Sequence, residues 1–125
     1  MRRTEKYISK TDMAIRKKFL VALNERLGVV AKRTEIVVNS REYPNTVTMS
    51  TMCLADPYTE IFGFMQKDET GNIVKFYAMT PFEFSKLLTK YEADTNKCVT
   101  SVNPETSGLV VRIPYSYLSN YVFAL

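Results

Sequence analysis

The chain has 125 residues, 46% of them hydrophobic and 24% charged, with two cysteines and no histidine. This length suits one domain with one core, and the composition is too apolar for a disordered protein. The lack of histidine excludes Ser-His-Asp and Cys-His catalytic pairs and imidazole zinc ligands, and no apolar run reaches the roughly 18 residues of a membrane-spanning helix.

The first quarter of the chain is strongly basic. Residues 1–33 hold ten Lys or Arg and three Asp or Glu, a net charge of +7, whereas the remainder holds seven and ten, a net charge of −3. Such asymmetry indicates a polyanionic partner. No apolar signal-peptide core follows Arg2 and Arg3, so we expect a cytoplasmic protein without a membrane partner.

Residues 1–10 are predicted to form a basic arm, followed by an amphipathic helix. Ser9 or Thr11 can cap this helix, and Gly28 suits its closing position after Leu27. Apolar residues at spacings of three and four form one core-facing stripe: Ile15, Phe19, Ala22, Leu23 and Leu27. The basic residues at 16–18 fall mostly away from that stripe.

Four strands are predicted in the middle of the chain, at 34–39, 46–54, 60–67 and 72–79, with a turn at 43–45. The last two strands flank Asp68-Glu69-Thr70-Gly71, where Gly71 can adopt a positive φ, so they form a hairpin. Cys53 and Cys98 lie in apolar strand-like runs and are expected to be buried free thiols.

A capping box predicts a second helix. Thr80 and Glu83 can exchange hydrogen bonds with each other's backbone N–H, Pro81 fits the first helical position, and the helix is expected to end near Glu92. Two short strands follow at 97–102 and 109–113 around a turn at 103–108. The segment 115–125 is either a short helix or a last strand.

These elements predict an α+β fold in a single domain spanning residues 1–125. We expect an antiparallel or mixed sheet of about five to six strands, with an N-terminal amphipathic helix and a second helix near 80–93.

No catalytic machinery is recognisable in the sequence. The four glycines are scattered and form no phosphate-binding loop, and two distant cysteines cannot complete a metal site. Asp56 with Glu60, or Asp68 with Glu69, could hold magnesium, but each pair has a simpler role in a turn. The prediction is a protein that is not an enzyme and needs no cofactor or metal.

Nucleic-acid binding is the predicted function, with contacts to phosphates from the arm and the first helix. Seven residues are the candidates: Arg2, Arg3, Lys6, Lys10, Arg16, Lys17 and Lys18. The simpler interpretation is a solvated helix face and an arm that aids solubility. Tyr115, Tyr117 and Tyr121 could stack on bases, but tyrosines more often cover the edge of a core.

The alternative function is a compact adaptor or inhibitor, of the type that viruses or mobile elements encode, which binds a host protein. Exposed strand edges would pair with such a partner, or with a second copy in a homodimer.

Overall fold

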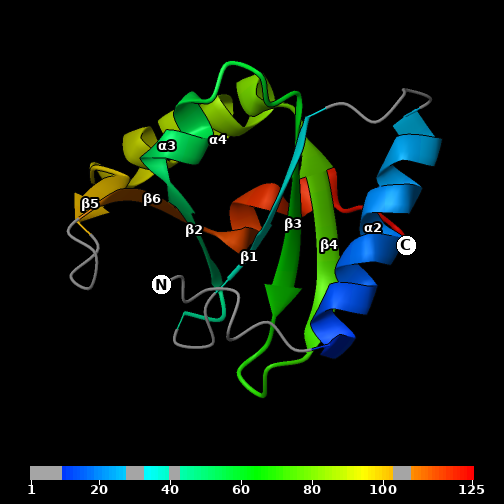
Figure 1. Cartoon of the computed structure of the whole chain (residues 1–125). Coiled ribbons are helices and arrows are strands. Elements are labelled where there is room, and N and C mark those ends of the chain that lie inside the picture. Colours follow the sequence, from blue (N-terminus) through cyan, green and yellow to red (C-terminus); the bar gives the residue numbers. More distant parts are fainter. Residues whose placement is uncertain (1–9, 28–32, 40–42, 103–107) are drawn as a thin grey trace.

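The computed structural model describes residues 10–27, 33–39, 43–102 and 108–125 (Figure 1). It confirms the α+β class, and the six strands formed by these residues divide between two three-stranded sheets. The helices are α2 (Lys10–Leu27), α3 (Thr51–Ala55), α4 (Pro81–Thr95) and the 3₁₀ helix η1 (Tyr115–Tyr121). The strands are β1 (Thr34–Val38), β2 (Thr46–Ser50), β3 (Ile61–Lys67), β4 (Ile73–Met79), β5 (Thr100–Val102) and β6 (Leu109–Pro114).

The first sheet has the strand order β1-β3-β4, and the second has the order β2-β6-β5. β1 runs parallel to β3, and every other pair is antiparallel. The chain leaves the second sheet after β2, passes through α3, and enters the first sheet at β3 (Figure 1). As a result β2 and β3, which are consecutive in the sequence, lie in different sheets.

Each face of the first sheet packs against a different layer. Because side chains alternate along a strand, Phe62 and Phe64 of β3 face the second sheet and α4, where they join the main core. Met65 faces the other way and packs with Phe19 and Leu23 of α2. The first sheet therefore lies between α2 and the rest of the molecule.

The predicted hairpin and capping box are confirmed. Gly71 has a φ of 91°, and the Asp68 carboxylate accepts hydrogen bonds from the backbone N–H groups of Thr70 and Asn72. Thr80 Oγ1 accepts from the Glu83 N–H at 3.1 Å, and Glu83 Oε1 accepts from the Thr80 N–H at 2.9 Å. Both features depend on hydrogen bonds between residues at most four positions apart.

Some predicted boundaries are wrong. The strand expected at 46–54 ends at Ser50, because the Ser50 hydroxyl accepts from the Met52 N–H at 3.1 Å and caps α3. Lys10 belongs to α2 and not to an arm, and α4 continues to Thr95. The final segment forms η1, followed by a single antiparallel bridge between Val122 and Tyr77.

Candidate functional site

Three predicted binding residues lie on the solvent-facing side of α2. Lys10 and Lys17 are two helical turns apart and therefore share one side, and Lys18 is adjacent to Lys17; all three are exposed. Arg2, Arg3 and Lys6 lie outside the described residues.

Arg16 is placed differently from these lysines. It lies on the flank of α2 that turns toward β1, is half-buried, and lines a groove there. The structure thus brings Lys10, Lys17 and Lys18 onto one exposed surface and separates Arg16 from them.

The acidic residue in the first turn of α2 points toward the sheet. Asp12 Oδ2 is 2.8 Å from Lys67 Nζ of β3, and only 16% and 14% of these side chains are exposed. Asp12 is the only acid between residues 10 and 18. The solvent-facing side of this half of α2 is therefore purely basic, a feature that sequence spacing alone did not reveal.

The groove beside Arg16 has a volume of about 780 Å³ and follows β1. One wall comes from α2, through Met13 and Arg16, and the opposite wall comes from β2 and α3, through Ser50 and Cys53. Glu35 of β1 also lines it. This groove combines apolar surface with charges of both signs.

The two cysteines lie in different surroundings. Cys53 is half-buried, and its Sγ lies 3.8 Å from Glu35 Oε2. Burial is the main reason that the pKa of its thiol is raised, and the negative charge of Glu35 raises it further. Both cysteines are free thiols, as predicted, but Cys98 is exposed because it precedes the edge strand β5. The expectation of a buried thiol was wrong at Cys98.

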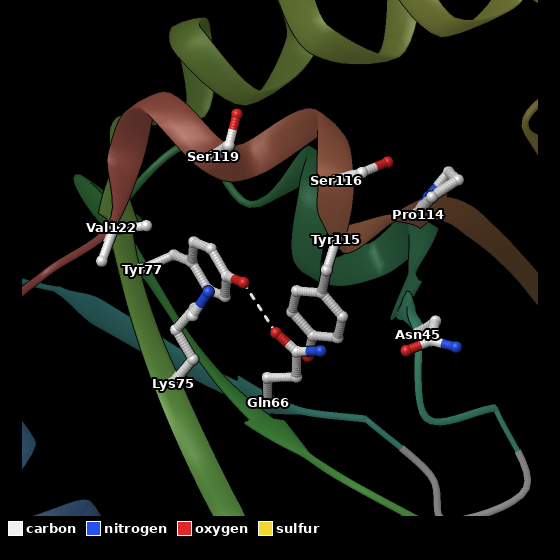
Figure 2. A pocket seen from close by; sticks show the side chains of 9 residues that line it. All are labelled: Asn45, Gln66, Lys75, Tyr77, Pro114, Tyr115, Ser116, Ser119 and Val122. Carbon is white, nitrogen blue, oxygen red and sulfur yellow. Dashed lines mark hydrogen bonds between the residues drawn. The ribbon is translucent and has the colours of Figure 1, made fainter.

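A second cavity, of about 320 Å³, lies where η1 meets β3 and β4 (Figure 2). The rings of Tyr77 and Tyr115 stack there with centroids 5.3 Å apart. The Tyr77 hydroxyl donates to Gln66 Oε1 at 2.6 Å, and the Tyr115 hydroxyl donates to Asn39 Oδ1 at 3.1 Å. Burial raises the pKa of both tyrosines.

The tyrosines of the final segment take the predicted packing role. Tyr115 is buried, and Tyr117 packs edge-on against Tyr91 at 5.1 Å. The Tyr117 hydroxyl donates to Asp94 Oδ2 at 2.8 Å, and this bond raises the pKa of Tyr117 and lowers that of Asp94. Tyr121 is half-buried against the main core. None of the three presents a fully exposed ring face.

Other aromatic rings are exposed beside cations. The Tyr58 ring is 65% exposed with the Arg33 guanidinium 5.2 Å from its centroid, and Phe82 is 71% exposed with Lys86 Nζ at 5.3 Å. Arg33 precedes β1, Tyr58 precedes β3, and Phe82 follows β4, so all lie at one end of the first sheet. Sequence analysis missed these rings; a Lys four positions after Phe82 was the available signal.

Within the described ranges, no group of three or more acidic or cysteine residues is arranged to hold a metal ion, and no helix is long and apolar enough to cross a membrane. No protein-family model matches the chain, and searches of curated proteins and of solved structures return no significant match. The geometry itself is therefore the basis for assigning a function.

Proposed function

We propose that this protein binds nucleic acid by contacting phosphates through the exposed side of α2. The observation that carries the proposal is the charge separation on this helix: Asp12 pairs with Lys67 on the sheet side, while Lys10, Lys17 and Lys18 face solvent. A purely basic helix surface attracts a phosphate backbone and releases its counterions on contact. Arg2, Arg3 and Lys6 precede this surface in the chain and would extend it.

Tyr58 and Phe82 are exposed at the end of the first sheet opposite the Asp12–Lys67 pair, and a nucleic acid that extended there from α2 would be favoured in its single-stranded form. Unpaired bases stack on exposed aromatic rings, and a base stacked in this way is worth about 1–3 kcal/mol. The cations Arg33 and Lys86 beside these rings would neutralise the adjoining phosphates.

The test is salt-dependent binding of fluorescently labelled DNA, single-stranded and duplex, measured by anisotropy at 50 and 200 mM salt. The variant Lys10→Ala/Lys17→Ala/Lys18→Ala is expected to reduce the slope of log affinity against log salt by about 2–3, since each phosphate contact contributes roughly 0.7–0.9. The control Lys75→Ala/Lys90→Ala/Lys97→Ala removes the same charge from exposed positions elsewhere and should change the slope by less than about 1.

Two outcomes would reject the proposal. One is the lack of measurable binding at 50 mM salt. The other is an equal loss in both triple variants, which would mean that net charge acts without a defined surface.

The alternative expectation, a cytoplasmic adaptor or inhibitor of a host protein, would use a different surface. It depends on an accessible strand edge and not on α2 lysines. A homodimer would also use such an edge.

A further inference from the structure

We propose that the groove beside β1 binds an extended peptide segment of a partner protein, which adds to the first sheet as a further strand. The segment carries an acidic side chain toward Arg16 and a basic side chain toward Glu35. This inference concerns a different surface from the α2 lysines and goes beyond nucleic-acid binding.

The backbone of β1 is paired on one side only. β1 is at the edge of the first sheet, and its neighbour is β3. The Arg33 carbonyl accepts from the Glu60 N–H at 2.8 Å, which turns Arg33 toward β3. Because successive residues of a strand direct their backbone groups to opposite sides, Ile36 and its alternate neighbours direct theirs to the open side.

The opposite edge of the same sheet is covered by the chain itself. The Phe123 N–H donates to the Phe76 carbonyl of β4 at 2.8 Å, and Val122 forms a bridge with Tyr77. The end of the chain thus lies along β4, whereas no described strand pairs with the open side of β1 (Figure 1).

The open edge of β1 is recessed. All five of its residues are half-buried, because α2 forms one wall of the groove and β2 with α3 forms the other. The volume of about 780 Å³ falls in the range of ligand-binding clefts, about 300–1,000 Å³. A single extended segment fits between these walls, whereas the edge of a second folded copy would bring its own covering helix and loops against them.

Charged groups on the two walls specify the segment. Arg16 is half-buried on the α2 wall and makes no ion pair or hydrogen bond with any described residue. Glu35 faces the opposite wall, where its described partner is the Cys53 thiol at 3.8 Å. Successive side chains of an added strand point to opposite walls, so neighbouring acidic and basic residues would meet Arg16 and Glu35.

The wall formed by β2 also contains an unsatisfied polar atom. Thr48 Oγ1 is buried and has no hydrogen-bond partner within the described part of the chain. A buried hydroxyl without a partner is unfavourable, so this wall is locally unsatisfied where it lines the groove.

The probe is a fluorescent, terminally blocked hexapeptide, Val-Thr-Asp-Lys-Val-Thr, titrated against the full chain. We expect saturable binding with a dissociation constant below about 1 mM. Exchanging its Asp and Lys should weaken binding about tenfold, since each charge then faces its like. Two further versions of the probe carry N-methyl groups on alternate residues, one version on the odd positions and the other on the even positions. One of the two versions should not bind, because its methyl groups replace the N–H groups that form backbone hydrogen bonds to β1.

Matched charge reversals test the position of the site. Arg16→Glu should weaken the probe at least about tenfold, whereas Lys17→Glu, the same charge change on the exposed side of α2, should leave it within about twofold. Amide hydrogen exchange should show protection of Ile36 and Val38 on binding.

Three results with the probe would overturn the proposal: no saturable binding at 1 mM, binding that neither set of N-methyl groups weakens, or hydrogen-exchange protection confined to strands other than β1. A concentration-dependent dimer in light scattering that protects the same amides without the probe would also overturn it, because the occupant would then be a second copy.

Discussion

At the residue scale, Asn39 explains how β1 ends and how the two halves of the molecule connect. Its buried side chain accepts from the Lys67 N–H at 2.6 Å and donates to the Lys67 carbonyl at 3.1 Å, which imitates one more strand residue. The Tyr115 hydroxyl donates to the same Oδ1 at 3.1 Å. One amide thus ties the first sheet to η1, which follows the second.

Gly63 is a residue at which an added methyl group would meet close neighbours. A Cβ there would lie 2.9 Å from Ile36 Cδ1 and 2.9 Å from Phe19 Cε2. Phe19 cannot move easily, because its ring packs against two others: the ring centroid of Phe76 is 4.9 Å away and that of Phe123 is 5.5 Å away. We predict that Gly63→Ala lowers the free energy of unfolding by about 1–3 kcal/mol, measured by urea denaturation.

A double variant serves as the control for Gly63→Ala. Ile36→Val removes the Cδ1 methyl group, so the combined loss in Gly63→Ala/Ile36→Val should be smaller than the sum of the two single losses. Strict additivity would contradict the steric explanation.

At the scale of elements, hydroxyl residues decide where helices begin. Ser50 ends β2 and starts α3, although the alternation from Val47 to Cys53 is typical of a strand. At α4, Thr80 and Glu83 form a reciprocal pair, and Asn96 closes the helix in the left-handed region at a φ of 56°. At Ser50 the side-chain bond to a backbone N–H outweighs the period-two pattern, whereas at Thr80 the cap agrees with the helix that the sequence predicts.

The cap of α4 makes a measurable prediction. Thr80→Ala should lower the free energy of unfolding by about 1 kcal/mol, because the Glu83 N–H loses its acceptor. Thermal and urea unfolding would measure this loss. Thr80→Ser keeps the hydroxyl and should retain nearly all of the stability; an equal loss in both variants would show that the methyl group, and not the cap, is responsible.

At the scale of the whole molecule, a stacked pair of tyrosine rings joins the first sheet to η1. Tyr77 comes from the first sheet, and Tyr115 from the start of η1, directly after the second sheet. Burial raises the pKa of both phenols above the usual value near 10, so the folded state favours their protonated forms. Their contribution to stability is complete below pH 10 and is lost as the pH rises above it.

We therefore predict base-induced unfolding. The free energy of unfolding should fall as the pH rises above about 10, and the fall should be less steep in Tyr115→Phe, which has no phenol to ionise. Urea denaturation between pH 8 and 11.5 would measure the slope. Identical slopes in Tyr115→Phe and the unmodified protein would contradict the prediction.

The sequence by itself determined the α+β class, the N-terminal helix, the hairpin at Gly71 and the cap of α4. These features depend on periodicity or on bonds between residues a few positions apart, so their causes lie within short windows of the chain.

Only the tertiary structure decided the division into two sheets, the pairing of Asp12 with Lys67, the half-burial of Arg16 and the groove along β1. Each requires partners that are far apart in the sequence, and long-range packing selects those partners. The basic character of the first helix was visible in the composition; which of its charges face solvent depended on the sheet against which the helix packs.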